Sequence, residues 1–252
     1  SVAFSPSGGL HHAMPASASG FCIFNDPAIA IQALVARGLR VAYVDIDAHH
    51  GDGVQEAFYT TDAVLTISLH ESGRYLFPGT GSVDELGTGR GTGYSVNVPL
   101  APYTDDDVYL WAFQEVVPPL LGAFRPDALV TQLGIDTYFS DPITHLVLTT
   151  RGYLQAVELL AQAARSIPWV ALGGGGYDLS AVARCWALAY GVMLGQEWPD
   201  DVPEGQRERL GTAKLRDETP PKIPEYIRKA SRRFAEATVQ EVQQRIFPYH
   251  GL

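Results

Sequence analysis

Residues 41–53, VAYVDIDAHHGDG, start as an apolar run and end in acids and histidines. Asp45, Asp47 and His49 occupy every second position as the apolar run ends, and alternation along a strand directs such side chains the same way. Sites form at the carboxyl ends of the strands in parallel α/β sheets. The stretch therefore predicts a buried strand whose exit supplies one aspartate oxygen and one histidine nitrogen to a divalent ion.

The flanking segments predict an α/β domain of three layers, with a mostly parallel central sheet between helices. Short β-rich runs at 41–46, 63–69, 128–134 and 168–173 alternate with helical patterns at 27–37, 54–60, 105–122, 151–166 and 180–194. Thr104 is the expected N-cap of the third helix, before three aspartates that suit a helix N-terminus. We assign residues 1–198 to one domain. Residues 199–252 are charged and proline-bearing, with a surface helix over 225–246, and form a tail packed on that domain.

Composition sets limits on location and partners. The 252 residues, 46% of them hydrophobic, suit one domain with a large buried core. No apolar stretch approaches the roughly 20 residues that cross a bilayer, and no secretory signal is evident, so we expect a cytoplasmic protein with no membrane partner. Cys22 and Cys185 lie in no metal-binding spacing, which argues against a disulfide framework and a cysteine zinc site. Residues 1–200 hold 20 acidic and 8 basic residues, which argues against nucleic acid as a partner. Solubility is the leading explanation of this acidity, and steering of cationic substrates is the alternative.

Further candidate residues follow other apolar runs. Asp136 follows the run in VTQLGID, and two converging strand ends fit three protein ligands with an open position for water; a cap or turn is the alternative for Asp136 alone. His11 and His12 form a pair in the Gly-rich PSGGLHH, and paired imidazoles suit proton transfer near pH 7. Asp45 and Asp52 are free carboxylates that would fix the histidine tautomers, unless Asp52 only shapes the HGDG turn.

The run GGGGY at 173–177 follows the last apolar strand, and its glycines let the backbone fold closely around a site and deliver Tyr177 to it. A tyrosine hydroxyl there would donate a hydrogen bond to a developing oxyanion. The alternative is a phosphate-binding loop, but neither GxGxxG opening a helix nor GxxxxGK[ST] is present. His50 and His70 are interpreted as structural histidines, and His145 and His250 lack supporting context.

Together these motifs resemble the histone deacetylase and acetoin-utilisation protein (AcuC) family, which has the arginase-deacetylase fold. The resemblance rests, in chain order, on GGLHHA, ASGFCIFND, YVDIDAHHGDG, ISLHESGRYLFPGTG, QLGIDT and GGGGYD. The sequences of these motifs are more similar to the bacterial AcuC branch, since eukaryotic members usually carry tryptophan where this chain has Leu10. The resemblance implies zinc-dependent hydrolysis of N-acetyl amides, either acetyl-lysine in proteins or acetylated small amines, with residues 1–198 as the catalytic domain.

The resemblance also implies roles for single residues. Zn²⁺, or Fe²⁺ in its place, would be held by Asp47, His49 and Asp136. His12 with Asp52 would act as base and then as acid, His11 with Asp45 would assist electrostatically, and Tyr177 would hold the oxyanion. The substrate tunnel would be lined by Gly20, Phe21, Phe77 and Ile143, with ordinary core packing as the alternative for the two phenylalanines. Structural K⁺ or Na⁺ ions would use Asp45, Asp47, His49, Ser68 and Leu69 in an inner set and Phe58, Thr61, Val64 and Tyr94 in an outer set.

One departure concerns the start of the chain. Family members normally carry a long region before the histidine pair, with the first sheet strands and a rim aspartate, which leads us to expect a fold lacking its N-terminal part. An exposed parallel sheet edge favours association into a homo-oligomer. Two rival hypotheses remain. An arginase-type ureohydrolase needs two metals and more ligands than this spacing supplies, and a non-catalytic sensor of acetylated ligands would not need His11, His12 and Tyr177.

Overall fold

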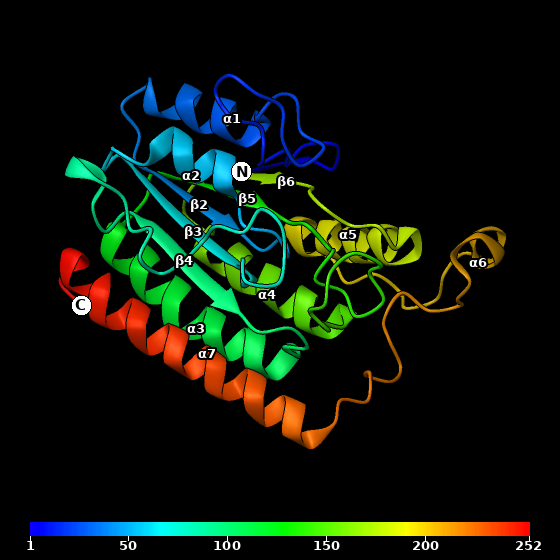
Figure 1. Cartoon of the computed structure of the whole chain (residues 1–252). Coiled ribbons are helices and arrows are strands. Elements are labelled where there is room, and N and C mark those ends of the chain that lie inside the picture. The colour runs from blue at the N-terminus through cyan, green and yellow to red at the C-terminus, as the bar shows by residue number, and fades with distance from the viewer.

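The computed structural model describes all 252 residues and places a six-stranded sheet between two layers of helices (Figure 1). Its strands are β1 (Val2–Ser5), β2 (Val41–Asp45), β3 (Val64–Glu71), β4 (Ser95–Leu100), β5 (Ala128–Gln132) and β6 (Trp169–Leu172). They lie in the order β1-β6-β5-β2-β3-β4, and every pairing is parallel. The expected three-layer α/β/α fold with a mostly parallel sheet is confirmed.

Helices cover both faces of the sheet, which is why its central strands are almost continuously apolar. The helices α1 (Asp26–Val35) and α2 (Asp52–Phe58) lie on one face. The other face carries α3 (Asp106–Phe124), α4 (Thr150–Ala163), α5 (Leu179–Leu194) and α7 (Glu225–Arg245). The short α6 (Glu204–Leu210) projects beyond these layers at the right of Figure 1.

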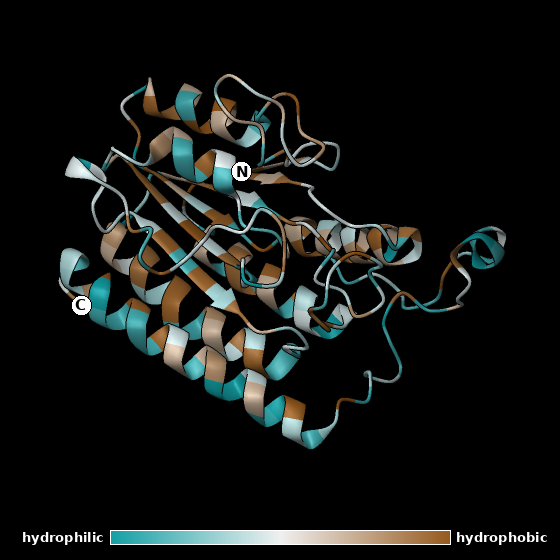
Figure 2. Cartoon of the chain, in the orientation of Figure 1, coloured by the Kyte–Doolittle hydropathy of each residue, from teal (hydrophilic) through white to brown (hydrophobic).

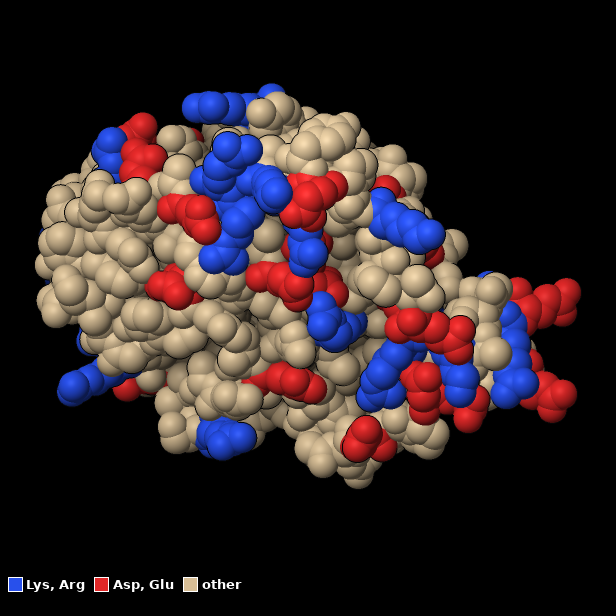
Figure 3. Space-filling view, turned by 90° about the horizontal axis from the view of Figure 1, so that it is seen from below, with Lys and Arg blue, Asp and Glu red and all other residues tan.

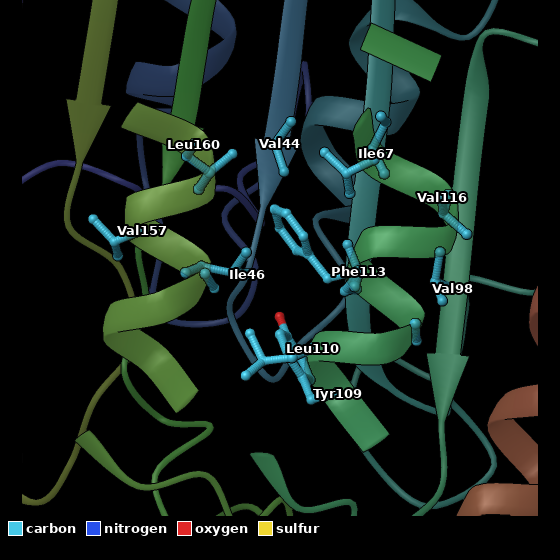
Figure 4. Close-up of a cluster of buried hydrophobic side chains, with 14 of the residues drawn as sticks. Val44, Ile46, Ile67, Val98, Tyr109, Leu110, Phe113, Val116, Val157 and Leu160 are labelled. Carbon is cyan, nitrogen blue, oxygen red and sulfur yellow. The ribbon is translucent and has the colours of Figure 1, made fainter. Parts of the chain in front are cut away.

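Strand alternation divides the core between the two faces. On β2, Val41 and Tyr43 pack with Ile31 of α1, whereas Val44 points to the opposite face, where Phe113 of α3 lies (Figure 4). Phe113 is almost fully buried, and burying such a side chain stabilises the fold by about 1.5–3 kcal/mol. The larger cluster therefore lies between the sheet and the α3, α4, α5 and α7 layer.

The helix α7 packs across α3 and β4 although it lies far along the chain. Its buried residues, Ser231, Ala235, Thr238, Val239 and Val242, recur at helical spacing and form one stripe. The outer side is hydrophilic (Figure 2), and acidic and basic side chains intermix over the face seen from the α7 side (Figure 3). The C-terminal helix thus covers the β4 edge of the sheet. None of the helices combines the length and apolar character that crossing a bilayer requires.

Three short elements and one cap differ from the prediction. Strands β1 and β4 and helix α6 were not expected, because β1 is short and mostly exposed, β4 contains Asn97 and Pro99, and α6 buries no residue. The expectation of Thr104 as the N-cap of α3 is wrong. Asp105 takes that place, since its carboxylate accepts the Val108 N–H at 3.1 Å, while the Thr104 hydroxyl donates to the Ala101 carbonyl.

Candidate metal centre and histidine pair

The site lies where the direction of strand succession reverses. From β2 the chain proceeds to β3 and β4 on one side, and α3 then returns it to the other side of β2, where β5 and β6 follow. The carboxyl ends of β2 and β5 are therefore adjacent, with Asp45 paired to Gln132 at the last register position. Such a switch point leaves a crevice between the diverging loops, and this is where ligands bind in open α/β sheets.

The three predicted metal ligands come together at this crevice. Ligand atoms of Asp47, His49 and Asp136 all lie within 4.8 Å of one another, and all three residues are buried. His49 Nδ1 lies 2.8 Å from Asp136 Oδ2 and 3.0 Å from Asp47 Oδ1. One nitrogen and two carboxylate oxygens, converging from strand exits, are a donor set that suits a divalent ion such as Zn²⁺.

The remaining carboxylate oxygens of this cluster already have partners. Asp47 Oδ2 accepts hydrogen bonds from Gln132 Nε2 at 2.6 Å and from the Gly175 N–H at 2.7 Å. Asp136 Oδ1 accepts the Ala48 N–H at 2.7 Å. These bonds orient the two other oxygens toward His49, so the residues fit a metal ion. Gln132 was missed by the sequence reasoning, although its place at the end of an apolar strand was a usable signal.

The local backbone explains how Asp47 and His49 converge. We expected strand alternation to continue through residues 46–49, but the strand β2 ends at Asp45. Instead the Asp47 N–H donates to Asp45 Oδ1 and the His49 N–H donates to Asp47 Oδ1, at 3.1 and 2.9 Å. Asp45 uses its other oxygen, Oδ2, to accept the Tyr43 hydroxyl at 2.6 Å. A hydrogen-bonded loop, and not the pleat, places the two ligands.

Burial and mutual charge shift the titration of these ligands. Burial and the neighbouring Asp47 carboxylate raise the pKa of Asp136 to about 7. Burial opposes protonation of His49, but hydrogen bonds to Asp136 and Asp47 outweigh it and raise the pKa of His49 to about 11. Two carboxylates this close in a buried site favour a positive charge beside them.

The histidine pair lies next to these ligands. His11 Nδ1 is 2.7 Å from Asp45 Oδ2, His12 Nδ1 is 2.7 Å from Asp52 Oδ1, and the two Nε2 atoms lie 3.1 Å apart. The His12 and His49 ring centroids are 5.8 Å apart. The predicted pairing of each histidine with its own carboxylate is thus present, and Asp52 does more than shape a turn.

The two histidines differ in charge. Burial disfavours protonation of His11, but the charges of Asp45 and Asp47 outweigh it and raise the pKa of His11 to about 9. Burial and the positive charge of His11 lower the pKa of His12. Near neutral pH, His11 therefore carries the proton and His12 is neutral.

Aromatic side chains border the site on its open side. Phe77 lies 5.1 Å from the His12 ring and 6.4 Å from the His49 ring, and Phe21 lies 6.2 Å from Tyr177, measured between centroids. Phe21 is 86% exposed and Phe77 is 48% exposed, so neither is a core aromatic residue. Tyr177 is partly exposed, and burial and the charges of Asp136 and Asp47 raise its pKa, which keeps its hydroxyl protonated.

Two other predicted wall residues have distinct positions. Gly20 has a φ of +50°, and a Cβ atom there would overlap the ring of His12. Ile143 is 41% exposed and lies in the loop after β5, where its N–H donates to Asp141 Oδ1 at 3.0 Å. Asp141 also accepts the Tyr177 N–H at 2.8 Å, and the sequence reasoning did not single it out.

The residues predicted for monovalent cations lie in two groups, the inner one beside the site and the outer one at the other end of the sheet, where β3 begins. Ser68 pairs with Asp45 in the sheet register, with Leu69 next to it in β3. Of the outer set, Phe58 ends α2, Thr61 donates its N–H to the Phe58 carbonyl, and Val64 begins β3. Tyr94 accepts the Thr66 N–H with its carbonyl oxygen. A cation role for either group stays a prediction.

The remaining histidines have structural partners. His50 contacts Thr80 and Gln55, and His70 contacts Ser68 and the Gly81 carbonyl, as expected for structural histidines. His145, for which the sequence offered no context, lies 2.9 Å from the buried carboxylate of Glu71. His250 contacts the Gly93 carbonyl. None of the four joins the metal ligands.

Comparison with known proteins relates this arrangement to one family. The family described as histone deacetylase domain matches residues 1–193. The acetoin utilization protein AcuC of Bacillus subtilis (strain 168) is 45% identical over 201 residues, which are 78% of this chain and 52% of that protein. Histone deacetylase 1 of Homo sapiens is 45% identical over 202 residues, which are 80% of this chain and 41% of that protein. The chain spans about half the length, or less, of these relatives.

Solved structures agree in the fold. The crystal structure of an HDAC homolog from Aquifex aeolicus matches with a TM-score of 0.85 and 32% sequence identity, covering 95% of this chain and 67% of that one. The crystal structure of an HDAC homolog complexed with SAHA matches with a TM-score of 0.86 and the same identity. The range that the family matches, residues 1–193, includes the candidate metal ligands, the histidine pair and the glycine-rich loop.

Proposed function

This chain belongs to the histone deacetylase family, and we propose that its site hydrolyses the amide bond of N-acetylated amines. One observation carries the proposal. Two histidines, each 2.7 Å from its own buried aspartate and with ring centroids 4.1 Å apart, lie beside three convergent candidate metal ligands. A proton-transfer pair next to a Lewis-acid site suits the hydrolysis of an unactivated amide.

The metal in this proposal is Zn²⁺, with Fe²⁺ as the alternative because mixed nitrogen and oxygen sites accept several metals. Asp47, His49 and Asp136 would hold it. When bound, the ion supplies a Lewis acid for the acetyl carbonyl and lowers the pKa of a water molecule. The hydrogen bonds from Gln132 and Ala48 to the other carboxylate oxygens support this assignment, since they fix how the ligands face the ion.

His12 is the proposed proton carrier. Its lowered pKa keeps it neutral near pH 7, and Asp52 orients the ring by accepting from Nδ1. Its Nε2 then takes a proton from water as the water oxygen attacks the acetyl carbon. The same proton passes to the amine nitrogen as the C–N bond breaks. The charged His11 would stabilise the negative charge that develops meanwhile, with Asp45 holding it in place.

Tyr177 would stabilise the transition state, and the aromatic side chains would contact the substrate. The protonated Tyr177 hydroxyl would donate to the developing oxyanion. The exposed rings of Phe21 and Phe77 would flank the apolar chain that carries the acetylated nitrogen, with Gly20 and Ile143 completing the walls. Acetyl-lysine in a protein and acetylated small amines both have such a chain.

Turnover of a fluorogenic acetyl-lysine peptide, together with metal analysis of the purified chain, tests the proposal. We expect one zinc per chain and loss of activity on chelation. His12→Ala should lower kcat by at least about 100-fold, the usual scale of general acid–base catalysis. His145→Ala removes an imidazole that touches no metal ligand and serves as the matched control.

Two results would contradict hydrolysis by this site. Tight binding of zinc and acetyl-lysine without turnover would favour a sensor of acetylated ligands. Two metals per chain would favour a ureohydrolase, although the structure contains only one group of three candidate ligands.

A further inference from the structure

A buried carboxylate links two loops that border the site, which the Ser140 hydroxyl also joins by donating to Asp178. Asp141, in the loop after β5, accepts the Ile143 N–H with Oδ1 at 3.0 Å and the Tyr177 N–H with Oδ2 at 2.8 Å. Its side chain is buried, and burial raises its pKa. Both of its oxygens are thus used to hold backbone amides of two residues that face the substrate side of the site.

Tyr177 lies just beyond the part of its loop that other hydrogen bonds hold: Gly173 is bonded to Ser5 and Leu133, and Gly175 accepts the Ile135 N–H at 2.7 Å. Residues 173–176 are all glycine, and glycine admits many backbone conformations. The loop is fixed upstream where the Gly175 N–H donates to Asp47, and downstream where Asp178 caps α5 by accepting from Ser180 and Ala181. Between these points, the hydrogen bond to Asp141 fixes the backbone at Tyr177 itself.

The loop that carries Asp141 is firmly held. The Asp141 N–H donates to the Tyr138 carbonyl at 2.9 Å, which closes a tight turn. The Tyr138 hydroxyl is bonded to both Arg184 and Asp217, and the Phe139 N–H donates to the Leu148 carbonyl. A carboxylate on a rigid turn can therefore fix the backbone position of Tyr177.

We infer that Asp141 is a positioning residue, which aims the Tyr177 hydroxyl at the developing oxyanion and sets the Ile143 wall at the same time. The inference rests on the proposed function, since it gives Tyr177 its oxyanion role. A carboxylate suits this task because it accepts from two amides at once, whereas an asparagine of the same shape has one acceptor oxygen. Misplacing an oxyanion donor by a fraction of an ångström affects the transition state more than it affects substrate binding.

The test is a double-mutant cycle with deacetylation kinetics. Asp141→Asn should lower kcat about 10- to 100-fold and change KM less than about threefold, because oxyanion donors act on the transition state. In a Tyr177→Phe background, Asp141→Asn should lower kcat by less than about twofold, since no hydroxyl remains to be positioned. Asp106→Asn is the matched control: Asp106 is also buried and also accepts a backbone N–H, from Thr149, but it contacts no residue of the site.

A second variant and a spectroscopic measurement keep the inference testable. Asp141→Glu retains both acceptor oxygens but moves them by one methylene group, and it should show the same dependence on Tyr177 if Asp141→Asn fails to fold. Fluorotyrosine placed at position 177 should give a fluorine NMR signal that shifts or broadens in Asp141→Asn and stays unchanged in Asp106→Asn.

The outcomes separate this inference from the function itself. If the unmodified chain does not hydrolyse acetylated peptides, the proposed function fails while the NMR comparison still tests whether Asp141 positions Tyr177. If the chain is active but Asp141→Asn lowers kcat by the same factor with phenylalanine at position 177 as with tyrosine, the inference is overturned and the function stands. An unchanged fluorine signal in Asp141→Asn would overturn it as well.

Discussion

The segment after α6 is anchored by a buried charge network, which makes its contribution to stability measurable. Asp217 accepts hydrogen bonds from Arg184 Nη1 at 3.0 Å, the Tyr138 hydroxyl at 2.7 Å and the Thr150 N–H at 2.8 Å. At an effective dielectric constant of about 20, a charge pair at 3.0 Å attracts with about 5.5 kcal/mol, part of which offsets desolvation. Removing one partner of a buried pair costs about 3–5 kcal/mol.

We expect Asp217→Asn to lower the free energy of unfolding by about 3 kcal/mol, the low end of that range, because asparagine keeps the shape and one acceptor. For a chain of this size the melting temperature should fall by about 6–12 °C. Thermal and urea unfolding measure the change. Asp201→Asn is the matched control, since Asp201, just before α6, pairs in solvent with Lys214 of the same segment, and it should leave the melting temperature unchanged.

The pH dependence of this effect has a defined sign. Burial opposes ionisation of Asp217, but the Thr150 N–H, the Tyr138 hydroxyl and Arg184 outweigh it and lower its pKa. The stabilisation is therefore complete above the unfolded pKa of about 3.9 and is lost as the pH falls through the lower folded value. The difference between the chain and Asp217→Asn should persist from neutral pH down to about pH 5. Equal stability of Asp217→Asn and Asp201→Asn at pH 7 would refute this reasoning.

Two further predictions concern the site. Because burial and the charge of His11 lower the pKa of His12 below 6.5, kcat/KM should fall as the pH drops through a midpoint below 6.5, and His11→Ala should move that midpoint to higher pH. A midpoint that moves to lower pH in a profile from about pH 5 to 8 would contradict the charge assignment. Gly20→Ala should lower kcat at least about tenfold by displacing the His12 ring, whereas Gly38→Ala, also at positive φ but in open space, should retain turnover. Equal kinetics of the two glycine variants would show that the close approach has no catalytic consequence.

Much of the site was predictable because its donors follow from local chemistry. Asp47, His49 and Asp136 are ionisable residues directly after apolar runs, and a strand exit in a parallel sheet is a place where such residues meet. The His11 and His12 pair stands out because no apolar periodicity surrounds it. The structure bears out these convergences with distances of 2.7 to 3.0 Å.

The supporting residues were not predictable in the same way. Gln132 and Asp141 look like ordinary polar residues near strand and loop ends, and their roles depend on partners 85 and 36 residues away. Strand β4 was missed for a related reason. Its Asn97 is buried because it donates to Gln55, a contact between two elements that no local pattern reveals. Long-range hydrogen bonds decide these cases, and the sequence carried a local signal only for Gln132, which ends an apolar run.

The sequence by itself determined the fold class, the candidate metal donors and the histidine pair, since periodicity and residue chemistry act over a few neighbouring positions. Only the tertiary structure decided that β5 lies beside β2, which oxygens of Asp47 and Asp136 remain free to face His49, and that one carboxylate joins the loops of Ile143 and Tyr177. The physical reason is that strand order and loop contacts depend on the packing of distant segments. The residue types of the site therefore follow from local sequence, whereas the orientation of their side chains depends on the tertiary structure.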